Sequence, residues 1–388
     1  MDEDMKDISN ELEKIRKSDL YREMRVVEGE QGPYVMVENK AYLSFCSNDY
    51  LGLANHPFVI KAAIDAVKQY GWGAGASRLI SGNMALHEKL EFEISRLKNR
   101  CSSLIFPTGY MANVGTICAL VEKGDIVICD RLNHASIIDG CRLSGATLRV
   151  YPHCDMKKLE KILKNSAPFR RKLIVTDSVF SMDGDLAPLP DIVTIANNHQ
   201  AVVMVDEAHG TGIFGKNGTG VVEHFGLENE ISIIMGTLSK AIGSLGGFVA
   251  GDLDLINYLR NRARTFIYTT ALPPAVCAAS IAGITIIRND HSLRHTLWSN
   301  IHYLKERLAS LDLELVPSES PIIPILIGDT KKTMDAAKFL FERRVLIPAI
   351  RPPTVPNRSS RLRITVMSSH TRDDLDKLLD ILKDIKHL

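Results

Sequence analysis

Paired cysteines are missing from this sequence of 388 residues. Its cysteines are odd in number and widely spaced, at positions 46, 101, 118, 129, 141, 154 and 277, and none forms a CxxC pair. This pattern is typical of reduced thiols in a cytosol and argues against a disulfide framework or a zinc site. We therefore expect a cytoplasmic protein without a bound metal.

Long apolar runs and a surplus of one charge are missing as well. No stretch approaches the roughly eighteen consecutive apolar residues of a membrane span, and the charged start, MDEDMKDISNELEKIRK, does not resemble a signal peptide. With 47 basic and 46 acidic residues, the net charge is +1. No strong field therefore attracts nucleic acid or a membrane surface, and we expect neither as a partner.

Short apolar segments that alternate with helical stretches occupy the middle of the chain. Each segment is apolar throughout, without polar alternation, which is typical of strands that are buried on both faces of a helix-covered sheet. The spacing leaves room for crossover helices, so we predict an α/β fold with a mostly parallel, doubly wound sheet. The segments are residues 102–106, 125–129, 147–151, 172–176, 201–205, 231–235 and 247–251.

Three parts are predicted along the chain. Residues 1–50 form an N-terminal segment with a helix at 2–20 and a hairpin made of YVMV and AYLSFC. Residues 51–285 form the large domain, and residues 286–388 form a small α+β domain. The boundary falls inside a long helical stretch that is broken near Asn289.

The small domain is predicted to mix strands and helices. Its expected elements are strands at LELV, IIPILI, RVLIPAI and RLRITV, a helix at 330–343 and a last helix that reaches residue 388.

Polar and titratable residues gather where the predicted strands end, which is where ligands bind in a doubly wound sheet. Lys240 lies in TLSKAIGSLGG, among small residues directly after an apolar strand, and Asp206 follows another strand. His134 and His209 belong to the same edge. Gly109 and Tyr110 begin a helix whose free N–H groups suit an anion.

This set of residues suits pyridoxal 5'-phosphate (PLP). The cofactor needs a lysine for its Schiff base, an acid beside its pyridine nitrogen, a helix N-terminus for its phosphate and a group packed on its ring. Each residue also has an ordinary structural interpretation: Asp206 as a helix cap, His134 as a helix-start residue, His209 as a loop histidine, Ser181 as a turn residue and Lys240 as a solvated side chain.

The tetrapeptide DEAH, at residues 206–209, is also the box of a helicase family. The following GTGIFGKN nearly matches a phosphate-binding loop, but Asn217 stands where that loop needs a hydroxyl for magnesium. A glycine-rich loop rather than a helix follows, so we reject the NTPase interpretation.

Ordered motifs over nearly the whole chain resemble the α-oxoamine synthase family of fold-type I PLP enzymes. The motifs are SFCSNDYLGL, GAGASRLISG, DRLNHASIIDG, DSVFSMDGDLAPL, VDEAHGTG, TLSKAIGSLGGFVAG, IYTTALPP and RLRIT. One departure is Ala76, where relatives commonly carry a second glycine.

The resemblance implies a role for each cofactor residue. Lys240 would hold PLP and then act as the base at Cα, Asp206 would pair with the pyridine nitrogen, and His134 would stack on the ring. The remaining cofactor residues implied are His209 at the phenolic oxygen, Ser181 and Thr237 as hydroxyls, Gly109 and Tyr110 beside the phosphate and ring, and Thr269 and Thr270 from the neighbouring subunit.

Substrate residues are implied in the same way. Arg363 would bind the amino-acid carboxylate, with Asn48 assisting, although a surface arginine and a turn asparagine are the ordinary alternatives. His134 would also hydrogen-bond the oxyanion that develops at the thioester carbonyl. Arg22 and Thr354 match positions that line the acyl pocket, and Arg25 is a rival for Arg22.

The segment AIRPPTVP, at residues 349–356, resembles the branch of the family that condenses L-alanine with a pimeloyl thioester in biotin synthesis. A sister synthase such as glycine C-acetyltransferase is the alternative. The acyl carrier is left open between coenzyme A and acyl carrier protein. The family also implies a homodimer with shared active sites, in which GASRLISG and IYTT cross between subunits.

Overall fold

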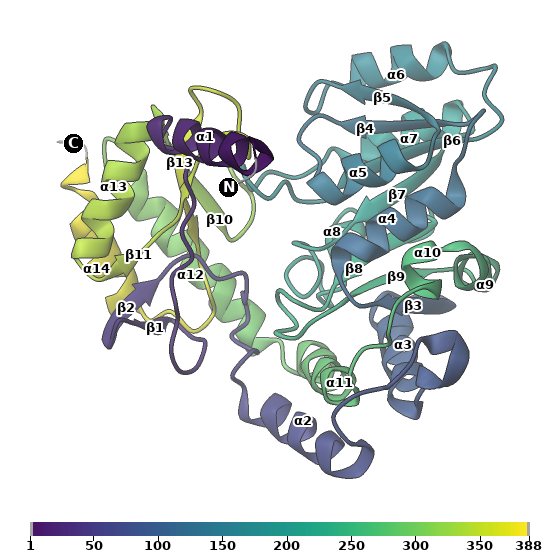
Figure 1. Cartoon of the computed structure of the whole chain (residues 1–388), viewed down its shortest axis with the longest axis horizontal. Helices are drawn as coiled ribbons and strands as arrows, with labels where there is room; N and C mark the ends of the chain where they lie inside the picture. The colour runs from purple at the N-terminus through teal and green to yellow at the C-terminus, as the bar shows by residue number, and fades with distance from the viewer. Residues whose placement is uncertain (1–2, 386–388) are drawn as a thin grey trace. The chain divides into compact units, whose positions relative to one another are not determined.

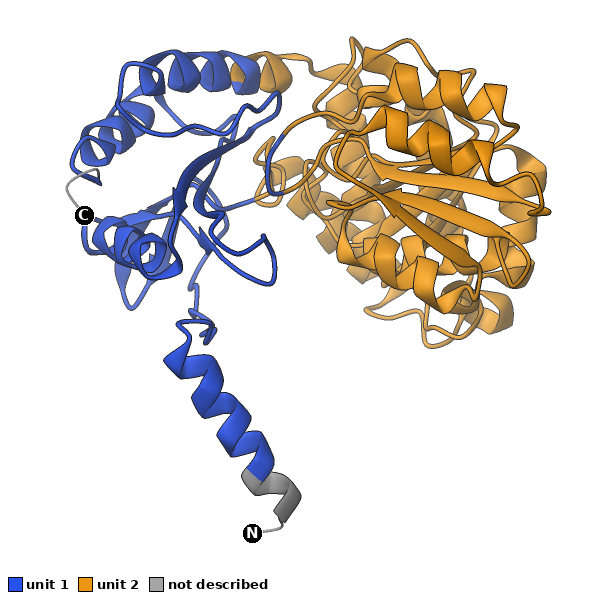
Figure 2. Cartoon of the chain, turned by 90° about the horizontal axis from the view of Figure 1, so that it is seen from above, with its two compact units in different colours: residues 1–47, 182–184, 297–388 blue, residues 48–181, 185–296 orange. Residues whose placement is uncertain are grey.

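The computed structural model describes residues 3–385 (Figure 1). The chain divides into two compact units, coloured separately in Figure 2. The large unit contains residues 48–181 and 185–296, and the small unit contains residues 1–47, 182–184 and 297–388. The three-part division at residues 50 and 285 stays a prediction.

A seven-stranded sheet forms the centre of the large unit, in the order β3-β9-β8-β7-β6-β4-β5. Neighbouring strands run parallel except for β9, which is antiparallel to both β3 and β8. The predicted α/β fold with a mostly parallel sheet is therefore confirmed. The strands are β3 (Ser102–Phe106), β4 (Ile126–Asp130), β5 (Thr147–Tyr151), β6 (Lys172–Asp177), β7 (Val202–Asp206), β8 (Ile233–Thr237) and β9 (Gly247–Gly251).

Two predictions about these strands need correction. Strand β8 begins two residues later than predicted, because the Ile231 N–H still bonds to the Leu227 carbonyl in a preceding turn. The strand therefore ends at Thr237, whereas the predicted strand ended at residue 235. Strand β5 is not buried on both faces: it lies at the sheet edge, where Arg149 and Val150 are exposed.

Helices cover the sheet of the large unit (Figure 1). One core joins Val127, Val175 and Met204 of the sheet to Ile117 of α4 and Ile137 of α5. Among residues 3–385, no helix combines the length and apolar character that crossing a membrane requires. The helices are α2 (Pro57–Tyr70), the π-helix η1 (Arg78–Gly82), α3 (Ala85–Leu97), α4 (Gly109–Leu120), α5 (Ala135–Leu143), α6 (Met156–Lys164), α7 (Leu189–Asn198), α8 (Val221–His224), α9 (Leu253–Arg262), α10 (Arg264–Ile267) and α11 (Pro274–Asn289).

Within residues 3–385, the small unit combines two three-stranded sheets with four helices, and the boundary between the units falls inside α12. The sheets have the orders β1-β2-β11 and β10-β13-β12. The elements are α1 (Glu3–Lys17), β1 (Tyr34–Val37), β2 (Lys40–Ser44), α12 (Ser292–Leu308), β10 (Ile322–Gly328), α13 (Thr330–Glu342), β11 (Val345–Leu346), β12 (Ala349–Ile350), β13 (Ser360–Thr365) and α14 (Arg372–Leu382).

Sequence predictions for this unit hold in part. The hairpin turns at Glu38 and Asn39, both with positive φ, and a helix break separates α11 from α12, as predicted. The single strand expected at RVLIPAI is split around Pro348, which has no N–H for a ladder. LELV is not a strand, because only Leu315 forms a β-bridge. Helix α14 ends at Leu382, and residues 386–388 lie outside the described residues.

Candidate active site

Asp206 ends β7 in the middle of the sheet and is 3% exposed. Its Oδ1 accepts the Ala208 N–H at 2.8 Å, and its Oδ2 accepts the side-chain amide of Asn113 on α4 at 2.8 Å. Each carboxylate oxygen has a further lone pair, so the group can still accept a proton donor such as a pyridinium. Asp206 is not a helix cap, because turns follow it.

His134 is the N-cap of α5, so its helix-start interpretation is correct and coexists with a position beside Asp206. Its Nδ1 lies 2.8 Å from the Ser136 hydroxyl and accepts the Ser136 N–H at 3.3 Å. Desolvation lowers the pKa of His134 although part of the ring is exposed; Asp206 opposes that effect and Lys240 adds to it. These charges place His134, Asp206 and Lys240 in one electrostatic environment.

Asp177 ends β6 and pairs in register with Asp206 on the neighbouring strand. Its carboxylate accepts the backbone N–H of His134 at 2.7 Å. Burial, with the charge of Asp206 adding to it, raises the pKa of Asp177 well above its usual range. Asp177 therefore favours the protonated form.

The loop between β8 and β9 explains why glycines surround the half-buried Lys240. The Gly243 N–H donates to the Lys240 carbonyl at 2.8 Å, and Gly243 has a φ of +70°. A Cβ on Gly243 would lie 2.4 Å from the Ala54 nitrogen. The glycine therefore closes a tight turn directly after Lys240 and packs it against the segment that follows Leu53.

The N-terminus of α4 lies against this loop. Thr108 caps the helix by accepting the Met111 N–H, which leaves the N–H groups of Gly109 and Tyr110 in the unpaired first turn. A Cβ on Gly109 would come within 3.7 Å of Thr237, and one on Gly247 would lie 2.6 Å from the Gly109 Cα. These close approaches form a cradle of backbone donors that suits a phosphate.

Two hydroxyl groups beside this cradle, those of Thr237 and Ser239, are hydrogen-bonded to each other. The Thr237 hydroxyl donates to the Gly246 carbonyl at 2.8 Å, so its hydrogen is used inside the loop. The exposed Ser239 hydroxyl lies 2.7 Å from the Thr237 oxygen and donates to it, because the Thr237 hydrogen is already used.

His209 is buried against Tyr50, whose hydroxyl lies 2.6 Å from the His209 Nδ1. The same hydroxyl lies 3.4 Å from the Asn48 side-chain oxygen. Tyr50 therefore brings together two residues that were predicted separately, although they lie far apart in the sequence.

Other predicted residues of the large unit occupy loops. Ser181 lies in the turn closed by the Val179–Leu186 bridge. Thr270 forms a β-bridge with Ser77, and the Ala271 N–H donates to the Ala76 carbonyl at 3.0 Å. Ala76 does not have a positive φ, so its methyl group fits the backbone there. Thr269 lies directly before this bridge, half-buried.

Arg363 belongs to the small unit, on β13, and is 5% exposed. Its Nη1 donates to the Thr365 hydroxyl at 2.9 Å. It also lies close enough to Cys46 to lower the pKa of that thiol, against a larger increase from burial. The ordinary interpretation of Arg363 as a surface arginine is therefore wrong.

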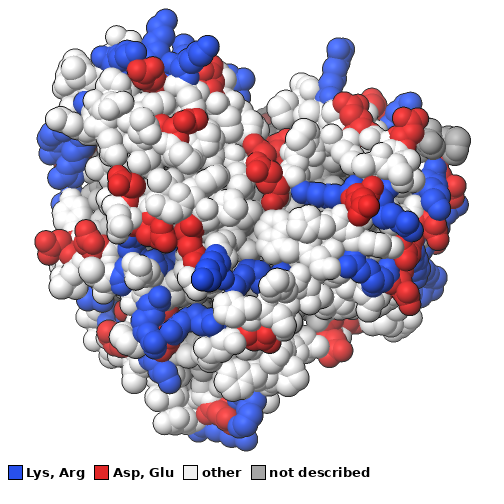
Figure 3. Space-filling view, turned by 180° about the vertical axis from the view of Figure 1, so that it is seen from behind, with Lys and Arg blue, Asp and Glu red and all other residues white. Residues whose placement is uncertain are grey.

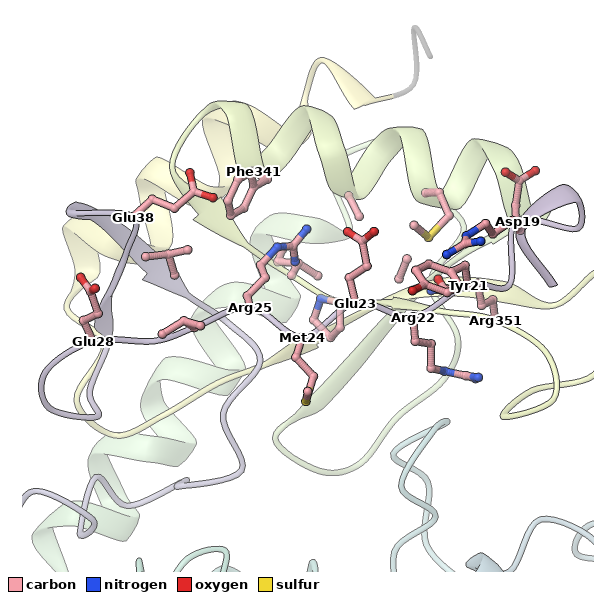
Figure 4. Close-up of a pocket in the computed structure, with 18 residues that line it drawn as sticks. Asp19, Tyr21, Arg22, Glu23, Met24, Arg25, Glu28, Glu38, Phe341 and Arg351 are labelled. Atoms are coloured by element: carbon pink, nitrogen blue, oxygen red, sulfur yellow. The ribbon is translucent and has the colours of Figure 1, made fainter. Parts of the chain in front are cut away.

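A groove of about 970 Å³ also belongs to the small unit (Figure 4). Arg22 lines it and is exposed, whereas the Arg25 guanidinium stacks 4.5 Å above the Phe341 ring. Arg351 on the same groove donates to the Tyr21 carbonyl at 2.5 Å. Thr354 is exposed, and its N–H bonds to the Arg351 carbonyl.

The DEAH segment has a structural role beyond Asp206. Glu207 is fully buried and accepts the N–H groups of Val221 and Val222 at 3.0 and 2.7 Å. Burial lowers the pKa of the neighbouring Lys98 to about 8, opposed by Glu207. Asn217, at the would-be phosphate-loop position, donates to Glu223 at 2.6 Å.

A further titratable cluster joins His153 to Asp130 and Asp185. The two His153 ring nitrogens lie 3.1 Å from Asp130 and 2.8 Å from Asp185. Burial lowers the pKa of His153, but these hydrogen bonds outweigh it and raise the pKa to about 12. The possible ligand atoms of Asp130, His153 and Cys154 lie within 4.8 Å of one another. Because both ring nitrogens face carboxylates, the cluster is an ion-pair network.

Comparison with known proteins gives close matches over nearly the whole chain. A family model for aminotransferases of class I and II matches residues 40–382. The 8-amino-7-oxononanoate synthase of Thermoanaerobacter pseudethanolicus is 46% identical over 383 residues, 98% of this chain and 97% of that protein. The 8-amino-7-oxononanoate synthase of Citrifermentans bemidjiense is 47% identical, with 98% of each chain covered.

Solved structures give the same fold. Serine palmitoyltransferase from S. paucimobilis, with a bound PLP–myriocin aldimine, is 31% identical, has a TM-score of 0.95 and is covered to 99%, with 100% of this chain. The 8-amino-7-oxononanoate synthase from Francisella tularensis is 31% identical, has a TM-score of 0.78 and is covered to 98%, with 89% of this chain.

Proposed function

The chain belongs to the class I and II aminotransferase family, and we propose that it condenses L-alanine with a pimeloyl thioester. The products are 8-amino-7-oxononanoate, CO2 and free thiol, in biotin biosynthesis. The observation that carries the proposal is the 46% identity over 98% of the chain to a synthase of that name. A buried acceptor, a nearby lysine and a helix N-terminus at one sheet edge support PLP as the cofactor.

We propose that residues of the large unit hold PLP. Asp206 would accept the pyridine N–H, the N–H groups of Gly109 and Tyr110 would donate to the phosphate, and His209 would contact the phenolic oxygen. The hydroxyls of Ser181 and Thr237 would contribute to the cofactor site, and those of Thr269 and Thr270 would contribute to the neighbouring subunit's phosphate site. When bound, PLP withdraws electrons from the bonds at Cα of the amino acid.

Protein side chains then direct the reaction. Lys240 removes the Cα proton of L-alanine and later returns a proton. His134 would pack on the cofactor ring and would hydrogen-bond the oxyanion that forms at the thioester carbonyl. Arg363, with Asn48, orients the alanine carboxylate that leaves as CO2, because a planar bidentate donor suits a carboxylate.

The acyl substrate is proposed to use Arg22 and Thr354 of the small unit. Arg22 is exposed on a groove large enough for a long ligand. Coenzyme A and acyl carrier protein both remain candidate carriers. In the view of Figure 3, acidic and basic side chains are interspersed, so this face gives no preference for an acidic carrier.

We also propose a homodimer with shared active sites. The two segments expected to cross lie side by side, joined by the Ser77–Thr270 bridge. Large apolar side chains beside them are exposed, with Ile80 at 81% and Tyr268 at 72%. Exposed apolar surface of this kind is typical of a protein interface. All seven cysteines are unpaired, which supports a cytoplasmic location.

A sister synthase is the second candidate, because serine palmitoyltransferase has the same fold with a TM-score of 0.95. The test is thiol release from purified protein with PLP, offered alanine, glycine or serine with pimeloyl, acetyl, succinyl or palmitoyl thioester. Release only with alanine and pimeloyl thioester is expected. Release mainly with glycine and acetyl or succinyl thioester would overturn the substrate assignment and leave the PLP chemistry standing.

A further inference from the structure

A continuous chain of hydrogen bonds joins Asp206 to His134 through two buried side chains. Asn113 Nδ2 lies 2.8 Å from Asp206 Oδ2 and 2.9 Å from the Ser136 hydroxyl oxygen. That hydroxyl lies 2.8 Å from His134 Nδ1. Asn113 is 1% exposed and Ser136 is fully buried, so water does not compete for these bonds.

The direction of each bond follows from the chemistry of its ends. An ionised carboxylate only accepts, so the amide nitrogen of Asn113, and not its oxygen, must face Asp206. The two amide hydrogens are then used by Asp206 and by the Ser136 oxygen. The Ser136 oxygen has a second lone pair, so this bond alone does not fix its hydrogen. The direction follows from His134 Nδ1, which already accepts the Ser136 backbone N–H and therefore also accepts the hydroxyl hydrogen.

His134 Nδ1 therefore accepts two hydrogen bonds. It receives the Ser136 hydroxyl hydrogen, and it also accepts the Ser136 backbone N–H at 3.3 Å as the cap of α5. A nitrogen that accepts two hydrogen bonds carries no proton, so a neutral ring has its proton on Nε2.

We infer that Asn113 and Ser136 are positioning residues that hold His134 in the tautomer protonated at Nε2. This inference rests on the proposed function, because it assigns His134 the role of a hydrogen-bond donor to the oxyanion. The charged groups that act on His134 are Asp206, Lys240 and Asp139. The lowered pKa of His134 agrees with a neutral ring at pH 7.

A fixed donor at Nε2 gives His134 and Lys240 separate roles in the reaction. Neutral His134 with Nδ1 occupied has no free lone pair to remove a proton, so proton transfer at Cα is left to Lys240. The same chain connects the carboxylate that holds the cofactor nitrogen with the group that faces the reacting carbonyl. A preorganised donor of this kind stabilises charge in the transition state without reorganisation.

The test is nitrogen-15 NMR of the full-length holoprotein labelled at histidine, with the His134 signals assigned from their loss in His134→Gln. Wild type is expected to show a proton on Nε2 and none on Nδ1. Ser136→Ala is expected to give a mixture of tautomers and to lower kcat by about tenfold, which is less than the loss expected when an oxyanion donor itself is removed. Ser144→Ala is the matched control, because Ser144 caps the other end of α5.

The outcomes separate this inference from the proposed function. A wild-type ring protonated at Nδ1 overturns the inference, even if Ser136→Ala fails to fold. An unchanged tautomer in folded Ser136→Ala also overturns it, whereas a change in Ser136→Ala and none in Ser144→Ala supports it. The NMR measurement needs no turnover, so absent thiol release with an Nε2 proton would overturn the function alone.

Discussion

The ionisable side chains at the strand ends of the large unit and those in the groove of the small unit lie in opposite surroundings. At the strand ends, Asp177 and Asp206 are buried and each has defined hydrogen-bond donors. In the groove, Arg22, Glu23 and Asp19 are exposed. Fixed charges in a low dielectric have large effects on a reaction, whereas solvated charges contribute little each. We expect the first region to determine chemistry and the second to adjust binding.

The largest expected effect is that of Lys240→Ala. Loss of the proposed base and Schiff-base lysine should lower thiol release at least about a thousandfold. It should also remove the absorbance near 420 nm that borohydride bleaches. Lys216→Ala, an exposed lysine in the glycine-rich loop, is the control and should keep full activity. An active Lys240→Ala protein would refute the assignment.

The two adjacent carboxyls should respond differently to the same change. Asp206→Asn should lower turnover on the order of a hundredfold, because a charged partner of the cofactor nitrogen is lost. Asp177→Asn should leave turnover nearly unchanged, because burial already favours the protonated form of Asp177. Steady-state kinetics of both variants checks this. Equal losses would show that Asp177 acts as an ionised group.

A buried histidine gives the small unit its own strong pH dependence. Burial lowers the pKa of His370 to about 4, and its nitrogens bond to the Ser44 carbonyl and the Met367 N–H. Because the unfolded pKa is about 6.5, stability is present above that pH and is lost as pH falls toward 4. The loss should be about 2 kcal/mol between pH 7 and pH 5.

Urea unfolding at several pH values measures this loss, and His370→Gln should flatten it. His153 in the large unit has the opposite sign, because its raised pKa gives stability below pH 6.5 that is lost as pH rises toward 12. An acid loss that survives in His370→Gln would place its origin elsewhere.

The smallest effect should come from the groove. Arg22→Ala should raise the KM for the pimeloyl thioester by up to about fivefold, the contribution of one exposed charge pair, with kcat unchanged. Arg25→Ala is the matched comparison, because its guanidinium stacks on Phe341. A larger rise in KM for Arg25→Ala would reverse the choice between the two arginines.

Strand ends are the part of the site that the sequence predicts well. Lys240, Asp206 and His134 follow apolar segments of the sheet, and the seven expected strands and the family assignment are confirmed. Asn113 was missed, although a lone asparagine inside the apolar helix GYMANVG signals a buried partner. Tyr50 gave no signal, because its contact with His209 spans 159 positions.

The small unit was harder to predict because its parts are separated in sequence. Strand β11 pairs with β2, and no local pattern specifies such pairing. The segment 182–184 joins this unit through an ion pair between Asp183 and Arg361. The periodicity of apolar residues predicts individual helices and strands. It does not predict which distant strands pair with each other, because that pairing produces no periodic pattern in the sequence.

This arrangement constrains the order in which the two units can fold during synthesis. Strands β1 and β2 are synthesised before the large unit, yet their sheet gains its third strand only when β11 has been made. Domains generally fold as units during translation. The large unit therefore has all its residues before the small one, and a nascent chain stalled after residue 296 should hold a folded sheet beside an N-terminal hairpin that still lacks a partner.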